Sequence, residues 1–146
     1  GKIFKDPSNT NKKFLRTRIR NLIKHFEKNG IKRDQIINSI NNLAATRDTL
    51  NSYINNVEKK CLKKKKDNIS INLNFFLLEN SDVQYKILSN SLKHISKNYY
   101  PPRAKKILNL ISRIKVKKEM KATLGGCIIN RRQNYLFVSK EELKRA

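Results

Sequence analysis

The stretch TLGGCIINRRQNYLFVSKE, residues 123–141, decides the fold of the second half of the chain. Two short apolar segments, at residues 124–130 and 135–139, have the composition of β-strands. The four polar residues between them, from Arg131 to Asn134, are typical of a turn. The stretch therefore predicts a β-hairpin.

The residues upstream of this hairpin predict one more strand and two helices. Ile69, Ile71 and Leu73 alternate with polar residues, which favours a short strand. Helical spacing of apolar residues follows over 81–97 and again over 103–117, and a Tyr-Tyr-Pro-Pro segment at 99–102 separates the two. We therefore expect residues 67–146 to form a small α+β domain of two helices, a short strand and the hairpin.

The first half of the chain reads as two helices, over residues 11–28 and 33–62, joined at Asn29-Gly30. The second has a long apolar seam with three- and four-residue spacing, typical of a helix packed lengthwise on a partner. We predict a long helical hairpin over residues 1–66, ending in the lysine run 63–66, which reads as a solvated helix end. The fold class is thus mainly α, of α+β type.

Two parts of the first half of the chain do not fit a simple pair of helices: Arg47 and residues 1–10. Arg47 falls within the apolar seam, so it must pair with a carboxylate such as Glu27 or Glu79, reach the surface, or face a ligand. Residues 1–10 are expected to be turn-like because Asp6 precedes a proline, with Ser8 and Asn9 as plausible helix N-caps.

The charge balance narrows the class of partner. The chain has 34 Lys and Arg against 11 Asp and Glu, for a formal net charge of +23. So many like charges repel one another and destabilise the compact state unless a polyanion binds. Nucleic acid is the first candidate for that polyanion, and a membrane surface is the second. An AT-rich coding bias would explain part of the lysine but not the arginine.

Membrane, metal and disulfide chemistry find little support in the sequence. No apolar run approaches the ~20 residues of a membrane span, and no signal peptide is evident, so we expect a cytoplasmic location without a membrane partner. Cys61 and Cys127 are expected to be reduced thiols, and no standard zinc spacing joins them to the histidines.

Cations gather in three places. In the first helix Arg16 and Arg20 lie one turn apart, and Lys13 and Lys24 extend their stripe, whereas Arg18 points elsewhere. Like charges so spaced repel, so the stripe favours phosphates or acidic groups opposite it, although a solvated basic face stays open. The use of Arg at 16 and 20 favours the first, because a guanidinium binds phosphate through two parallel hydrogen bonds.

The other two patches lie in the second half. One sits beside Tyr99 and Tyr100, a combination that suits RNA, where rings stack on bases, although tyrosines packed on the prolines would explain it equally well. Its cations are Arg103, Lys105 and Lys106. The third patch is Arg131 and Arg132 in the predicted hairpin turn, where solubility alone is the competing explanation.

The sequence holds no recognisable catalytic constellation. Its four glycines do not form a phosphate-cradling loop between a strand and a helix, because Gly125-Gly126 precedes a strand. No Ser/His/Asp triad or carboxylate pair stands out. The residues alone therefore indicate a nucleic-acid-binding module with neither a catalytic residue nor a metal site of its own.

Three segments, in this order, resemble tRNA(Ile)-lysidine synthase. The first is the D-x-S-N turn of Asp6, Ser8 and Asn9, followed by a helix with the R-x-x-x-R pair Arg16 and Arg20. The second and third, YYPPRAKKI (99–107) and TLGGCIINRRQNYLFVSKE (123–141), are similar to the family's substrate-binding domain. The resemblance covers nearly all of the chain.

The resemblance implies an enzyme that uses ATP, with Mg²⁺, to join lysine to the wobble cytidine of tRNA(Ile). The family's ATP loop belongs to an N-terminal PP-loop domain, which this sequence lacks, so the chain alone is expected to be inactive. Asp6, Ser8 and Asn9 would lie at the junction with that domain, and Arg16 and Arg20 would face the active-site cleft or the anticodon loop. The family also suggests a homodimer.

The remaining cations, Lys24 and the second and third patches, would hold the body of the tRNA through its backbone. Two other functions stay open: a non-enzymatic, ribosome-associated RNA-binding protein, and a basic protein that docks on anionic membranes.

Overall fold

The computed structural model describes the backbone of residues 7–142 and the side chains of residues 14–142. The chain divides into two compact units, Gly1–Thr49 and Leu50–Ala146. The division falls inside helix α2 (Arg33–Cys61), earlier than the boundary predicted after residue 66. The reason is that the last turns of α2 bury Ile54, Val57 and Cys61 in the core of the second unit.

The first unit contains α1 (Pro7–Lys28) and the first part of α2. Helix α1 begins at Pro7 and not near residue 11, because proline suits the first position of a helix. Ser8 and Asn9 are therefore helical, which corrects their prediction as cap residues in a turn, whereas Asp6 lies outside the described residues.

The predicted break between the two helices is confirmed. Gly30 adopts a φ of 85°, in the left-handed region that glycine occupies without strain. The backbone amides of Asn29 and Ile31 both donate to the carbonyl of Phe26, at 3.0 Å each. The apolar seam of the second helix was expected to pack along its whole length, but Leu43, in its first-unit part, is 71% exposed. Leu15 of α1 is also exposed, at 56%.

The second unit is built on a five-stranded antiparallel sheet in the order β1-β2-β5-β4-β3. The strands are β1 (Leu62–Lys64), β2 (Asn68–Asn72), β3 (Glu119–Leu124), β4 (Cys127–Arg132) and β5 (Tyr135–Lys140). The helices are α3 (Leu73–Phe76), α4 (Ser81–Ser96) and α5 (Ala104–Val116), together with the end of α2. The α+β class, strand β2 and the β4–β5 hairpin are confirmed.

Two strands were not predicted. The lysine run does not end a helix, since Leu62–Lys64 pairs with β2 as an edge strand. Strand β3 pairs with β4 through a two-residue turn at Gly125-Gly126, whose φ values of 60° and 80° give the backbone the twist of a tight hairpin. The glycine pair is thus a turn between strands and not the start of one.

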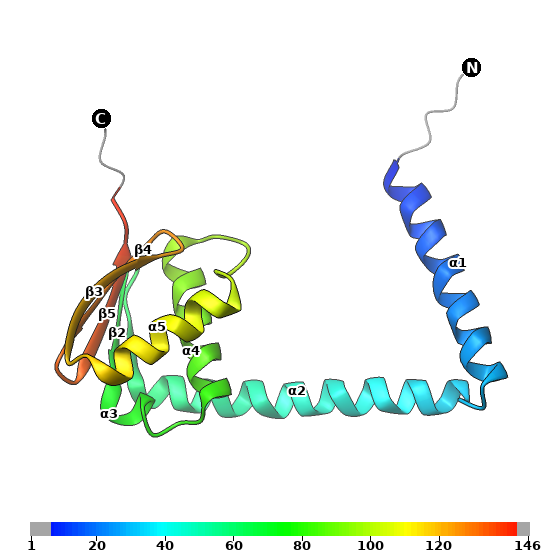
Figure 1. Cartoon of the computed structure of the whole chain (residues 1–146), viewed down its shortest axis with the longest axis horizontal. Helices are drawn as coiled ribbons and strands as arrows, with labels where there is room; N and C mark the ends of the chain where they lie inside the picture. The colour runs from blue at the N-terminus through cyan, green and yellow to red at the C-terminus, as the bar shows by residue number, and fades with distance from the viewer. Residues whose placement is uncertain (1–6, 143–146) are drawn as a thin grey trace, which may run out of the picture. The chain divides into compact units, whose positions relative to one another are not determined.

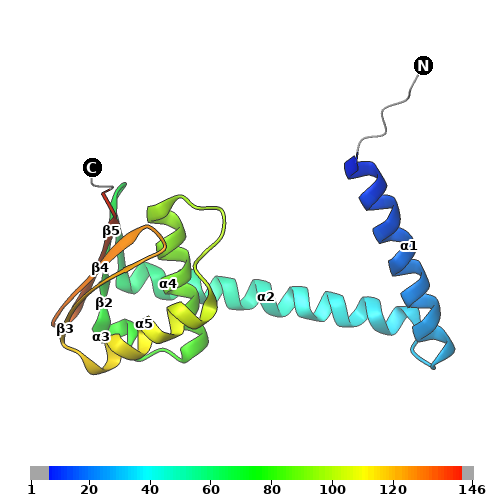
Figure 2. The ribbon, with the colours of Figure 1, turned by 45° about the horizontal axis from the view of Figure 1, so that its top comes forward.

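Figures 1 and 2 both show α4 and α5 on the same face of the sheet. The inward side chains of the strands meet these helices in one apolar core. Its fully enclosed members include Phe76, Ile87, Leu92, Ile107 and Ile129. The opposite face of the sheet carries no described helix of the second unit.

Candidate nucleic-acid interface

The arginine stripe of α1 is available to a ligand. Arg16, Arg20 and Lys24 are exposed, and their four-residue spacing places them on one side of the helix. Among the described residues, none of the three forms an ion pair, because the pairs found there are Arg47–Asp48 and Lys64–Glu58. The stripe can therefore offer its guanidinium groups to phosphate.

The second patch, which precedes and begins α5, is also open to solvent. Tyr99 and Tyr100 are exposed and touch each other edge to face, with their ring centroids 4.7 Å apart. Neither tyrosine ring is buried. Pro102, in contrast, is half-buried, and its ring lies against Gly125. The cations of the patch, Arg103, Lys105 and Lys106, are exposed beside them.

The third patch separates into one buried and one exposed arginine. Arg131 lies in β4 and not in the turn, which consists of Gln133 and Asn134. Its Nε donates to the carbonyl of Gln133 at 2.9 Å, and its Nη1 donates to the carbonyl of Ile114 near the end of α5. Arg131 is only 9% exposed, so it acts as a structural cap and leaves the predicted RNA-binding set, whereas Arg132 is exposed.

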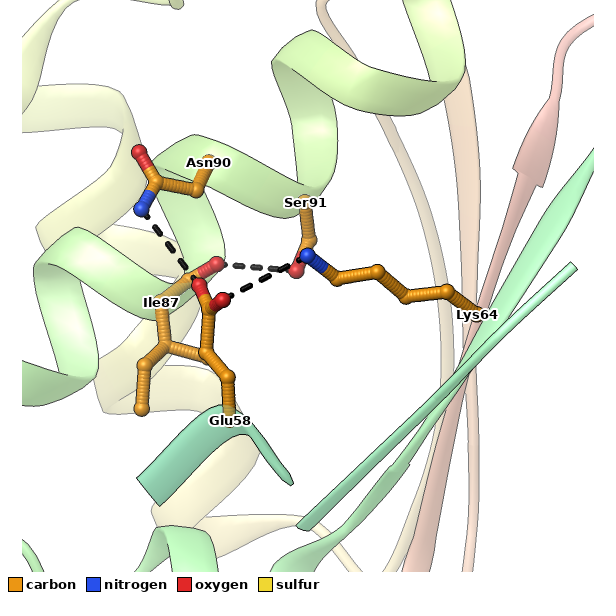
Figure 3. Close-up of polar contacts among 5 residues, drawn as sticks. All are labelled: Glu58, Lys64, Ile87, Asn90 and Ser91. Atoms are coloured by element: carbon orange, nitrogen blue, oxygen red, sulfur yellow. Dashed lines mark hydrogen bonds and ion pairs between the residues drawn. The ribbon is translucent and has the colours of Figure 1, made fainter. Parts of the chain in front are cut away.

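Lys64 also has a structural role. Its Nζ lies 3.3 Å from Oε2 of Glu58, whose other oxygen accepts from Asn90 at 3.4 Å (Figure 3). Glu58 is 9% exposed, so its charge needs these donors. The cluster joins the end of α2 to β1 and α4 through Lys64, although all four lysines of the run are exposed.

Arg47 reaches the surface, which was one of the alternatives expected for it. Its side chain is 73% exposed, and its Nε lies 3.9 Å from the carboxylate of Asp48, which is 75% exposed. Glu79, one of the two carboxylates considered as partners, instead accepts a hydrogen bond of 2.7 Å from the hydroxyl of Tyr53. That bond raises the pKa of the Tyr53 phenol, because it stabilises the protonated form.

The sequence reasoning missed an aromatic pair on the sheet. Tyr135 and Phe137, on β5, are 47% and 42% exposed, and their rings stack with centroids 6.3 Å apart and an angle of 27° between planes. The signal lies in the alternation of YLFVSK, in which Leu136 and Val138 are buried. The two exposed rings could have been assigned to the outer face from that period alone.

Both cysteines are buried, and burial keeps their thiols in the protonated form. Cys61 and Cys127 are both free and buried. Burial, assisted by the charge of Glu58, raises the pKa of the Cys61 thiol to about 11, and burial also raises the pKa of Cys127. Both thiols are therefore protonated at neutral pH and unsuited to nucleophilic chemistry.

The described part of the chain, taken as a whole, has neither a metal-binding cluster nor a membrane-spanning helix. Within it, no three His, Cys, Asp or Glu side chains are grouped so that they could hold a metal ion. Within the same residues, no helix has the combined length and apolar character needed to cross a bilayer.

Comparison with known proteins adds no relative. No protein-family model matches the chain, and no curated protein matches it. The residues and their geometry are therefore the basis for a function.

Proposed function

We propose that this chain is the tRNA-binding part of a tRNA(Ile)-lysidine synthase, the ligase that the three sequence segments resemble. In that role it would hold tRNA(Ile), while a PP-loop domain would bind ATP with Mg²⁺ and join lysine to the wobble cytidine. The proposal places the chain in the cytoplasm. It leaves this chain by itself without ligase activity.

The observation that carries the proposal is the exposed arginine stripe of α1, which has no ion-pair partner among the described residues. A chain of net charge +23 could bind RNA with any of its cations. Arg16 and Arg20, however, combine exposure and helical spacing with the R-x-x-x-R pattern of the resemblance. Their bidentate geometry suits phosphate oxygens, so they are the first candidates for contact with tRNA.

The apolar side of the same helix supports a neighbouring domain. Leu15, Ile19 and Leu22 are each about half exposed, although their spacing is that of a buried stripe. Exposing such an apolar stripe to water is unfavourable, and another surface packed on it removes that cost. The PP-loop domain implied by the resemblance is the occupant that we propose, with Arg16 and Arg20 at its edge.

Binding of tRNA should be measured by fluorescence anisotropy across a salt series. We expect affinity to fall steeply between about 50 and 200 mM salt, because each phosphate that the protein neutralises releases counterions. The variant with Arg16→Gln and Arg20→Gln should bind more weakly. Its log–log salt slope should be less steep by about 0.9 for each phosphate that is no longer neutralised.

Arg18→Gln is the matched control, since it removes the same charge from the same helix but outside the stripe. Equal effects of Arg18→Gln and of either stripe substitution would show that only total charge matters, as in a general ribosome-associated protein. An affinity that does not change with salt would contradict phosphate contact altogether. In the full-length ligase, the stripe substitutions should lower lysidine formation more than Arg18→Gln does.

A further inference from the structure

The outer face of the sheet is a defined surface of the second unit. Strand residues alternate between the two faces, and the buried residues Leu136 and Val138 point toward the helices. Tyr135 and Phe137 therefore point to the other side, on β5, which is the middle strand of the sheet. No described helix of the second unit lies on this side of the sheet (Figures 1 and 2), and the two side chains are 47% and 42% exposed.

The row of residues across Phe137 is flanked by cations. In the strand register Phe137 lies between Ser70 of β2 and Asn130 of β4. Beyond these, at the two edges of the sheet, come Lys63 of β1 and Lys121 of β3. An exposed ring thus has a polar neighbour on each side and a lysine beyond each of those.

The row across Tyr135 is shorter and carries one cation, directly beside the ring. Tyr135 lies between Asn72 and Arg132. Glu119 follows Arg132 at the edge, so this row carries a carboxylate beside its cation. The Phe137 row is therefore the more positive of the two.

We propose that this outer face binds single-stranded RNA, with two successive unpaired bases stacked on Tyr135 and Phe137 and the backbone held by Lys63, Lys121 and Arg132. The inference rests on the proposed function, since it takes RNA to be the ligand, and it assigns unpaired nucleotides of that RNA to a site outside the arginine stripe. The hydroxyl of Ser70 and the amide of Asn130 lie between the Phe137 ring and the two lysines. The amide of Asn72 lies beside Tyr135 on the side away from Arg132. All three groups can donate to base edges or ribose hydroxyls.

The chemistry of the face favours a single strand over a duplex. In a duplex the bases stack on one another, so no ring of the protein can reach their faces. Flat, exposed rings flanked by cations match unpaired bases, whose faces stack on aromatic side chains while the phosphates follow positive charge. The three cations of the two rows outnumber their single carboxylate, so the balance also favours an anionic ligand.

The absence of tryptophan from the sequence allows a direct test in the whole chain. Phe137→Trp introduces a single emitter at the proposed site, and Phe75→Trp introduces one on α3 at a residue of similar exposure, 47%. A non-self-complementary RNA of about eight nucleotides should quench the emission at 137 because a base stacks on the indole. The emission at 75 should not change.

Affinity is measured with the same RNA, labelled with fluorescein. We expect the variant with Tyr135→Thr and Phe137→Thr to bind it at least about ten-fold more weakly, at an unchanged salt slope, because base stacking is removed while the phosphate-binding cations remain. Threonine is favourable in strands, so the sheet should persist, and thermal unfolding checks this. Phe75→Thr is the control and should bind as the unmodified chain does.

The outcomes separate this inference from the proposed function. If the unmodified chain binds tRNA and the short RNA, and the double variant binds both equally well, the sheet site is overturned while the proposed function stands. If the unmodified chain binds neither RNA, both are overturned. An emission change at 137 that follows protein concentration without RNA would identify a self-association surface and would also overturn the inference.

Discussion

The two units use the same residue types in opposite ways. Leu43, in the first unit, is 71% exposed, whereas Leu92, in the second, is fully enclosed. Both belong to helices with regular apolar spacing. The first unit keeps its helices through local backbone bonds and a glycine turn, and the second adds a shared core to the same kind of helix. Helical periodicity thus predicts a helix, but not what buries it.

Cations show the same contrast. Arg16 and Arg20 of the first unit are exposed and unpaired among the described residues, whereas Arg131 and Lys64 of the second satisfy a helix end and a buried carboxylate. A count of basic residues treats all four alike. Burial and hydrogen bonding separate the cations that hold the fold from those that stay exposed to solvent.

The largest expected difference in stability between the two units is the one between the variants at Leu92 and at Leu43. Leu92→Ala should destabilise the chain by about 2–5 kcal/mol, because it removes a fully buried side chain and leaves a cavity. Leu43→Ala should change stability by less than about 0.5 kcal/mol, since the side chain is already in water. Urea denaturation followed by circular dichroism compares the two. A similar destabilisation by both would mean that the first unit has a core of its own.

The second prediction compares two glycines with positive φ. A Cβ on Gly125 would lie 2.6 Å from Cγ of Pro102, whereas a Cβ on Gly30 would meet nothing within 4 Å. Gly30→Ala should therefore cost about 1 kcal/mol, from the left-handed backbone alone. Gly125→Ala should cost about 2–3 kcal/mol, because the rigid proline ring must also move. Thermal unfolding measures both, and equal costs would show that the β3–β4 turn yields freely.

The third prediction splits the neighbouring arginines. Arg131→Met should lower stability by about 1–3 kcal/mol, because the carbonyls of Ile114 and Gln133 no longer have their donor. Arg132→Met should leave stability nearly unchanged and weaken binding to the single-stranded RNA. Unfolding and anisotropy, measured on both variants, give a crossed pattern. A weaker RNA affinity for Arg131→Met, at full stability, would return that residue to the RNA-binding set.

Much of the second unit could be predicted from local pattern. Helix α4 and strand β2 each lie within a residue or two of their expected bounds, because apolar spacing and turn residues agree there. Strands β1 and β3 could not be, since both lie at sheet edges and neither has a fully buried residue. Edge strands are held by backbone pairing with a neighbour, which leaves little trace in their own sequence.

The candidate site was predictable in part. Exposure of the α1 stripe follows from its helical spacing and its charge. Arg131 was assigned to the turn because the predicted turn had four residues, 131–134. Its position two residues after Ile129 and four after Cys127 would have put it on the inward face of β4. The same alternation in β5 would have placed Tyr135 and Phe137 outward. Which carbonyl or carboxylate a buried cation meets depends on segments far away in sequence, so no local pattern contains it.

The smallest expected difference concerns the two ion pairs, one in each unit. Lys64 and Glu58 lie 3.3 Å apart with side chains 44% and 11% exposed, whereas Arg47 and Asp48 lie 3.9 Å apart and are both about three-quarters exposed. Lys64→Met should cost about 1 kcal/mol, because it leaves a mostly buried carboxylate with Asn90 as its remaining donor. Arg47→Met should cost less than about 0.3 kcal/mol, since water and salt already screen the pair.

Repeating the urea titrations at about 1 M salt provides the control for this last comparison. Screening acts mainly on exposed charges, so the small effect of Arg47→Met should vanish while most of the effect of Lys64→Met persists. Equal effects of the two substitutions, both abolished by salt, would mean that Glu58 is as well solvated as Asp48. The polar cluster at the end of α2 would then be a surface contact, and the contrast between a packed unit and an open one would no longer extend to its charges.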